Sequence, residues 1–246
     1  MSDERTEFET GPGFPGDGRA LGGRGGHVGA PPFMVGFSGG SGSGKTTLLG
    51  LVADELGRDQ TSVLCHDAYY RDRGDLDDAE RAELDFDIPE ALDQERFRDD
   101  LARLRRGEPV CPPRYSFATH RRDGDGAVVD PRPFVLVDGI LILHDPAVRA
   151  LLDLTIYVDA PSLLRLRRRV TRDRQERGRT LASVLRQYAE TVMPAHVRYV
   201  EPTRQVADVV LQNTGRLEPL VEIAATLIRA RRDGREEART GARVFA

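Results

Sequence analysis

The sequence is poor in three things: lysine, cysteine and long apolar runs. Lys45 is its only lysine, and its two cysteines, Cys65 and Cys111, are too far apart to suggest a metal site or a disulfide framework. This cysteine usage favours a reducing, cytoplasmic setting. No apolar run reaches the ~18 residues of a membrane span, and the N-terminus lacks the apolar core of a signal peptide. The net charge of −4 argues against general nucleic-acid binding.

The single lysine lies in a glycine-rich motif that predicts a phosphate-binding loop. Residues 39–47 fit G-x-x-x-x-G-K-[ST], after an apolar run at 33–37 that predicts a buried strand and before a predicted helix that ends near Gly57. Glycines let the backbone wrap phosphates, and the free N–H groups of a helix start favour negative charge. A flexible linker that matches by chance is the alternative, but strand, loop and helix all agree with the motif.

The motif also predicts which groups touch the nucleotide. Lys45 is expected to reach the β- and γ-phosphates of ATP, and the Thr46 hydroxyl to ligate Mg²⁺. The predicted nucleotide-binding residues are Gly39, Gly40, Ser41, Gly42, Ser43, Gly44, Lys45, Thr46 and Thr47.

Two carboxylates follow predicted parallel strands, at the sheet edge where such folds bind ligands. Asp67 follows a strand at 61–65 and is placed to accept a proton from an attacking hydroxyl. Asp138 ends the apolar strand at 134–137, a Walker-B-like position that can hold Mg²⁺. Each residue has an ordinary alternative as a turn or capping aspartate.

An arginine-rich helix beginning near residue 161 predicts a lid over phosphates. Three of its arginines recur on one face: Arg165, Arg169 and Arg172. Gly178 then provides a hinge between Arg177 and Arg179. A mobile basic loop of this kind can stabilise charge on transferring phosphates. A solvated basic face and an RNA-binding patch remain the alternatives.

The element pattern predicts an α/β, P-loop NTPase-type three-layer fold. We expect a mostly parallel sheet with helices on both faces, a small β-hairpin and helix insertion at about 71–133, and the lid at about 165–180, all within a domain at 31–232. The insertion is expected to hold an acidic helix at 75–84, a helix at 92–106 and a hairpin whose turn lies at 123–126. Residues 1–30 read as a disordered glycine-rich extension and 233–246 as a frayed charged tail.

Taken together, the motifs resemble those of the uridine (uridine–cytidine) kinases. The matching stretches occur in family order at 39–47, 66–70, 86–93, 115–120, 138–141, 156–161, 172–179 and 187–188. The D-x-[FY]-Y, F-D-x-P and E-R-G-R elements are together far more specific than the phosphate loop alone. The resemblance implies transfer of the γ-phosphoryl group of ATP to the 5′-hydroxyl of uridine or cytidine, in a homo-oligomer that is often a tetramer.

The resemblance also implies residue roles. Asp67 matches the general base, and Lys45 with the lid arginines Arg172 and Arg177 completes the implied catalytic set. The residues implied to hold the nucleoside are Asp87 and Arg169 at the ribose, Tyr115 and His120 at the base, and Arg179 and Gln187 along the site. Without the resemblance, Asp87, Tyr115 and His120 are ordinary residues.

The chain departs from the family pattern at four places. Ile88 replaces a usual histidine, Asp138 a usual glutamate, and Arg114 an apolar residue, and 212–215 differs from the usual P-R-G loop.

Three other functions stay open. One is a related P-loop kinase that acts on a sugar phosphate or pantothenate, the second a non-catalytic ATP-binding scaffold, and the third an RNA-binding arginine module. A GTPase switch is excluded, because its N-K-x-D motif needs a second lysine.

Overall fold

The computed structural model describes residues 30–74, 76–77, 84–117 and 119–244. The predicted N-terminal extension therefore lies outside the described residues, apart from Ala30. Most of the acidic helix predicted for 75–84 also falls outside them. None of the helices in these ranges combines the length and the apolar character needed to cross a bilayer.

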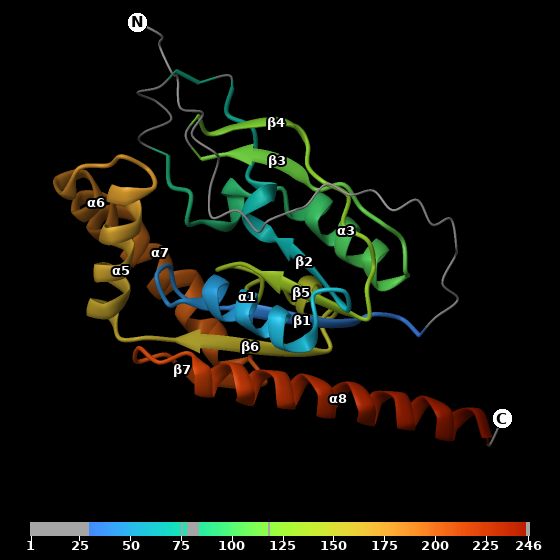
Figure 1. The fold of residues 1–246 in the computed structure, drawn as a ribbon. Helices are drawn as coiled ribbons and strands as arrows, with labels where there is room; N and C mark the ends of the chain where they lie inside the picture. Colours follow the sequence, from blue (N-terminus) through green and yellow to red (C-terminus); the bar gives the residue numbers. More distant parts are fainter. Residues whose placement is uncertain (1–29, 75, 78–83, 118, 245–246) are drawn as a thin grey trace, which may run out of the picture.

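Five parallel strands form the central sheet, in the order β2-β5-β1-β6-β7. Their bounds are Phe33–Ser38 (β1), Thr61–Cys65 (β2), Phe134–Asp138 (β5), Leu154–Asp159 (β6) and Val209–Gln212 (β7). The arrows of β5 and β6 point toward the side of the molecule that carries the lid helices (Figure 1). The predicted parallel sheet is confirmed.

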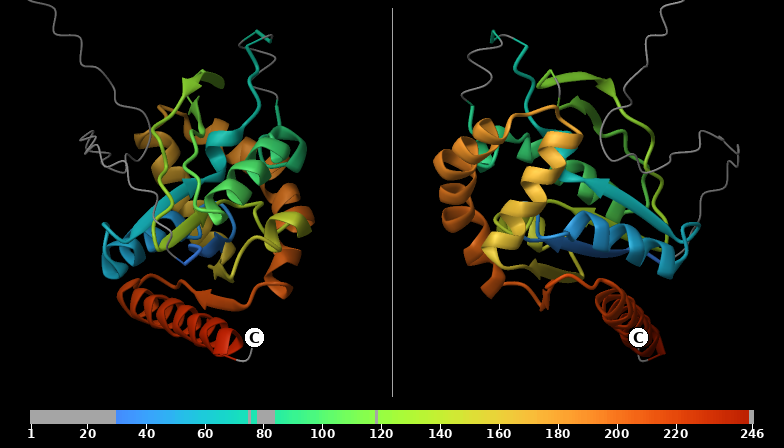
Figure 2. Two further views of the ribbon diagram at one scale, coloured as in Figure 1. Left: turned by 90° about the vertical axis from the view of Figure 1, so that its right-hand side faces the viewer. Right: turned by 60° about the vertical axis from the view of Figure 1, so that its left-hand side comes forward.

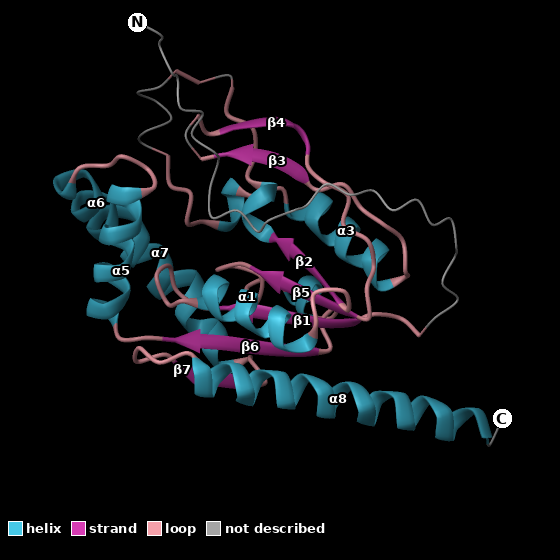
Figure 3. Ribbon diagram, viewed as in Figure 1, coloured by secondary structure: helices cyan, strands magenta, loops and turns pink. Residues whose placement is uncertain are grey.

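Helices cover both faces of this sheet, as the three-layer prediction requires (Figure 3). Alternate residues of β1 enter different cores, because side chains along a strand point to opposite faces. Phe33, Val35 and Phe37 pack with α1 (Lys45–Leu56) and α8 (Glu218–Val244). Met34 packs on the other face with α3 (Gln94–Arg105) and the segment that leads to α4 (Pro146–Arg149).

The lid side of the molecule is helical. Helix α5 spans Ser162–Gln175 and α6 spans Leu181–Gln187. The chain continues through the π-helical turn η3 (Tyr188–Val192), α7 (Met193–Ala195), a second π-helical turn η4 (His196–Val200) and the 3₁₀ turn η5 (Glu201–Gln205). The helix predicted for 181–199 therefore exists, but π turns interrupt it, a feature that is frequent beside functional sites.

The insertion contains the expected hairpin, but its turn is not where the sequence placed it. Strand β3 (Pro113–Ser116) pairs antiparallel with β4 (Arg121–Asp125), so the prediction of a turn at 123–126 was wrong. The chain reverses between Ser116 and Arg121, where His120 has a positive φ of 52°. An Asp-Gly pair is a strong turn signal, whereas a histidine in this conformation gives no such signal.

The C-terminal tail is also different from the prediction. Helix α8 runs to Val244, so residues 233 to 244 are helical rather than frayed. Arg235 explains why the helix continues: its Nη1 lies 2.6 Å from the Asp153 carboxylate and 3.3 Å from the Pro32 carbonyl. Its guanidinium also lies over the Phe33 ring. Figure 2 shows α8 lying along one side of the sheet.

Candidate active site

The phosphate loop connects β1 to α1 with the geometry that its glycines permit. Gly39 has a φ of +140°, and a Cβ there would lie 2.3 Å from the Val158 carbonyl oxygen. Gly44 has a φ of +89° at the start of α1, where a Cβ would lie 2.4 Å from the Asn213 side chain. The Ser43 N–H donates to the Gly40 carbonyl at 2.9 Å. Larger residues would open the loop, so its conformation requires glycine at these two positions.

Asp138 forms the floor beside this loop. It ends β5, the strand between β1 and β2, opposite Phe37 and Cys65. The Thr46 hydroxyl donates to Asp138 Oδ2 at 2.5 Å, and Lys45 Nζ lies 3.6 Å from Asp138 Oδ1. The structure thus brings the predicted metal residues and the lysine into contact.

The charges of this group are coupled. Burial lowers the pKa of Lys45, but the negative charges of Asp138 and Asp67 outweigh it and raise that pKa above its ordinary value. Burial raises the pKa of Asp138, and Lys45 only partly opposes the rise. Lys45 is therefore paired with Asp138 and lies within electrostatic reach of Asp67.

The donor atoms at this floor fit Mg²⁺ only together with a nucleotide. Asp138 Oδ1 is buried and, in the part of the chain that the structure describes, has no hydrogen-bond partner. Over the same residues, no group of three or more His, Cys, Asp or Glu side chains is placed to hold a metal ion. Mg²⁺ is commonly bound through one or two carboxylates plus substrate phosphates, and Asp138 with the Thr46 hydroxyl suits that arrangement.

Asp67 lies between the phosphate side and the insertion. It belongs to the 3₁₀ turn η1 (His66–Tyr69), directly after β2, and its side chain is half-buried. Its charge reaches Lys45 on one side and Asp87 on the other. The carboxylate thus lies after the carboxyl end of β2, as the sequence predicted, and within electrostatic reach of both Lys45 and Asp87.

Asp87 precedes the 3₁₀ turn η2 (Pro89–Ala91) and is buried. Burial raises the pKa of its carboxyl group, Arg169 counteracts the rise, and the charges of Asp85 and Asp67 add to it. Asp87 and Arg169, predicted as a pair, therefore lie within electrostatic reach of each other.

A cluster of aromatic rings lies near Asp87. The Tyr115 hydroxyl and His120 Nδ1 are 3.3 Å apart. The His120 ring stacks on Phe86 with a centroid distance of 4.4 Å and an interplanar angle of 15°. Tyr70 packs against Tyr115 at 5.2 Å. The structure brings the two predicted base-binding residues together and sets them among further aromatic rings.

Two of the family departures, Arg114 and Ile88, have partners within the fold. Arg114 Nη2 pairs with the Asp123 carboxylate across the hairpin at 2.7 Å, and both side chains are exposed. Ile88 packs against the core cluster that contains α3.

The lid residues converge on Gln187 and Asp173. Arg169 donates to Ser41 Oγ at 2.9 Å and to Gln187 Oε1 at 3.0 Å, and Arg179 also donates to Gln187 Oε1. Arg172 and Arg177 both pair with Asp173. Through Arg169, helix α5 is joined to the phosphate loop and to the end of α6.

Arg165, predicted on the same face, has a different position. It is buried, its Nε donates to the Ala160 carbonyl at 3.2 Å, and its Nη1 lies where a Cβ on Gly40 would be. It supports the back of the phosphate loop rather than the lid.

Sequence reasoning assigned no role to three residues of the site. Asp173 pairs with the lid arginines, and Arg168 and Asn213 hold the phosphate loop from behind: their side chains donate to the Ser43 carbonyl at 3.1 and 2.7 Å. Asp173 is the only carboxylate in α5, a signal that was available. Asn213 lies in the loop that departs from the family pattern, where no general rule indicated it.

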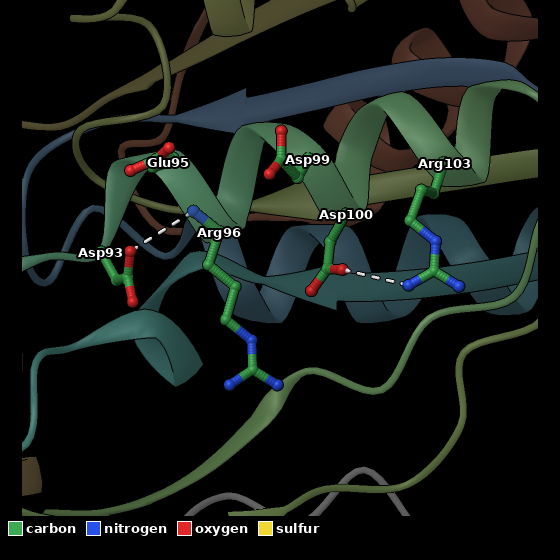
Figure 4. A pocket seen from close by; sticks show the side chains of 6 residues that line it. All are labelled: Asp93, Glu95, Arg96, Asp99, Asp100 and Arg103. Atoms are coloured by element: carbon green, nitrogen blue, oxygen red, sulfur yellow. Dashed lines mark hydrogen bonds and ion pairs between the residues drawn. The ribbon is translucent and has the colours of Figure 1, made fainter.

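A separate groove lies along α3, with a volume of about 420 Å³ (Figure 4). It is lined by Asp93, Glu95, Arg96, Asp99, Asp100 and Arg103. Asp93 caps α3 by accepting from the Arg96 N–H, and Asp100 accepts from the Tyr69 hydroxyl at 2.7 Å. These two interactions stabilise the fold, and none of the six lining residues is a predicted site residue.

Comparison with known proteins places the chain among kinases. The model of the phosphoribulokinase / uridine kinase family matches residues 34–218. A uridine kinase of Deinococcus deserti is 41% identical over 204 residues, which cover 83% of this chain and 98% of that relative. A uridine kinase of Geobacillus kaustophilus is 38% identical over 82% of this chain and 96% of its own length.

Solved structures support the fold. Phosphoribulokinase from Rhodobacter spheroides aligns with a TM-score of 0.58 at 18% identity, over 75% of this chain and 71% of that chain. D-glycerate 3-kinase from Cryptococcus neoformans aligns with a TM-score of 0.50 at 16% identity, over 68% of this chain and 78% of that chain.

Proposed function

The chain belongs to the phosphoribulokinase / uridine kinase family, and on that premise we propose that it phosphorylates the 5′-hydroxyl of uridine or cytidine with ATP. The observation that carries the proposal is the position of Asp67. Its charge reaches Lys45 at the phosphate loop and Asp87 at the insertion. This reach toward both groups supports a role for the Asp67 carboxylate in serving an acceptor hydroxyl beside a bound triphosphate.

In this proposal each part of the site has one task. Asp87 and Arg169 hold the ribose hydroxyls, and Tyr115 with His120 reads the base. Asp67 orients the 5′-hydroxyl and accepts its proton. Lys45, Arg172 and Arg177 stabilise charge on the γ-phosphoryl group as it transfers. Mg²⁺ bound by Thr46 and Asp138 would neutralise phosphate charge. Catalysis is then mainly positioning and electrostatic stabilisation.

An ADP-release assay with ATP, Mg²⁺ and a panel of acceptors tests the proposal. The panel contains uridine, cytidine, purine nucleosides, sugar phosphates and pantothenate. We expect ADP release with uridine or cytidine, and a 5′-monophosphate product. Release with a sugar phosphate or pantothenate alone would support the related-kinase alternative. If the chain binds ATP but no acceptor of the panel gives ADP release, the result would support the non-catalytic scaffold.

The base-reading role of His120 gives a separate prediction. Because one hydrogen bond is worth about 0.5–1.5 kcal/mol, the His120→Ala variant is expected to raise KM for the nucleoside about 2- to 10-fold. KM for ATP should stay near the wild-type value, and initial rates at varied nucleoside and varied ATP measure both. The matched control is His144→Ala, which removes an exposed histidine outside the site. A His120→Ala chain that loses rate equally with every alcohol acceptor would contradict base reading.

Three further features stay predictions: ATP rather than GTP as donor, a homo-oligomer, and a cytoplasmic location.

A further inference from the structure

Asp173 lies at the centre of the lid, and its side chain has no exposed surface. Its Oδ1 accepts from Arg172, with Nε at 2.9 Å and Nη2 at 2.8 Å, and lies 3.7 Å from Nη1 of Arg177. Its Oδ2 lies 3.5 Å from Nε of Arg169. Its main-chain carbonyl accepts from the Arg179 N–H at 3.0 Å. Four lid arginines therefore contact this one residue.

The charges in this cluster do not balance. Although burial raises the pKa of Asp173, the charges of Arg172, Arg169 and Arg177 hold it below its ordinary value, so Asp173 is a carboxylate. Burial lowers the pKa of Arg177, and the neighbouring charge of Arg172 lowers it further. Within the lid, one carboxylate thus faces several guanidinium groups, with Asp67 and Asp87 as further anions nearby. The excess positive charge suits the negative charge of a transferring phosphoryl group.

The Arg169 guanidinium is held by one ion pair and two hydrogen bonds. Its Nε and Asp173 Oδ2 are both buried, and neither has a hydrogen-bond partner among the described residues. The attraction between them is therefore that of an ion pair, while the two terminal nitrogens of Arg169 donate to Ser41 and Gln187. The charge of Asp173 thereby helps to fix the arginine that bridges α5 and the phosphate loop.

We propose that Asp173 is the positioning residue of the lid: its charge assembles Arg169, Arg172 and Arg177 beside the phosphate loop before the triphosphate binds. Without the Asp173 charge, the three positively charged arginine side chains would repel one another and adopt other conformations. Charge stabilisation of a transferring group depends on donors that are already in place. Asp173 acts through the arginines and does not itself contact substrate. The inference rests on the proposed function for its catalytic consequence.

The test compares Asp173→Asn, which keeps the volume and removes the charge, with the wild-type chain. We expect kcat to fall about 10–100-fold, since misplacing a catalytic group by about 1 Å can cost that much. The dissociation constant for ATP, measured by calorimetry without acceptor, should change less than about threefold. Trypsin should cleave after the lid arginines about tenfold faster, because the lid is no longer held. Glu190→Gln, which removes an exposed carboxylate from the neighbouring turn η3, is the matched control and should behave as wild type.

Asp173→Glu separates charge from packing. It keeps the carboxylate and moves it by one methylene group, so we expect a kcat at least fivefold above that of the asparagine variant. Should the asparagine chain not fold, the glutamate variant alone decides: a kcat within tenfold of wild type with unchanged ATP affinity supports the proposal.

Several outcomes overturn the inference. They are an asparagine variant with wild-type kcat and cleavage rate, equal losses in the two variants, or, when only the glutamate variant folds, a glutamate kcat more than tenfold below wild type. If the wild-type chain phosphorylates no acceptor of the panel, the proposed function fails, but the trypsin comparison still shows whether Asp173 holds the lid.

Discussion

Replacing Asp67 with asparagine is expected to lower kcat by about 10²–10⁴-fold, the range that a positioned general base contributes. Asparagine keeps the shape of the side chain but accepts no proton from the 5′-hydroxyl. Asp67 is half-buried at the end of β2, so the variant should fold. Single-turnover rates with the acceptor that the panel identifies measure the effect on the chemical step.

Binding must be measured in the same variant. Calorimetric titration should show that Asp67→Asn still binds the nucleoside and ATP with affinities close to wild type, because other residues make those contacts. Asp99→Asn is the matched control, since Asp99 is an exposed carboxylate in the groove on α3. A turnover within a few-fold of wild type, with nucleoside still bound, would show that Asp67 is not the base.

Replacing Lys45 with methionine is expected to lower kcat/KM about 10²–10³-fold, the range seen when one charge-stabilising group is removed. Methionine fills the same space without the ammonium. The change also leaves Asp138 as a buried carboxylate without its lysine, 3.6 Å away in the native chain. We therefore expect a loss of up to about 3 kcal/mol in the free energy of unfolding, measured by urea denaturation.

Two further variants separate the catalytic effect from the stability effect. Lys45→Met combined with Asp138→Asn removes both charges, so it should recover most of the stability and none of the turnover. Lys45→Arg keeps the charge but replaces a compact ammonium with a planar guanidinium, and should be more stable than the methionine variant while still slow. Normal turnover in the arginine variant would refute a specific need for lysine at this position.

The half of the site that binds phosphate could be predicted from local sequence. A strand, a loop with fixed glycines and a helix start are neighbours in the chain, so Gly39, Gly44 and Lys45 are positioned by residues close to them. Asp138 was also predictable, because an apolar run fixes where β5 ends. Parallel strands then bring their carboxyl ends to one edge without further information.

Other features depend on contacts between distant residues, which local patterns do not contain. The hairpin turn uses His120 in a left-handed conformation, and the Asp-Gly pair that predicts a turn lies within β4. The last turns of α8 were assigned to a tail because Arg235 finds Asp153 only in the folded chain. Asp173 reads as one more surface charge in an arginine run until the helix places it, buried, among Arg169, Arg172 and Arg177.

The single lysine has a consequence for covalent modification of this chain. Acetyl groups, isopeptide-linked protein tags and amine-directed cross-linkers all attach to a lysine side chain, and this chain offers one. That lysine is Lys45, with an 11% exposed side chain beside Asp138 at the phosphate loop. Any modifying enzyme or reagent that needs a side-chain amine must therefore reach Lys45 at the phosphate loop, and we expect bound nucleotide to protect it.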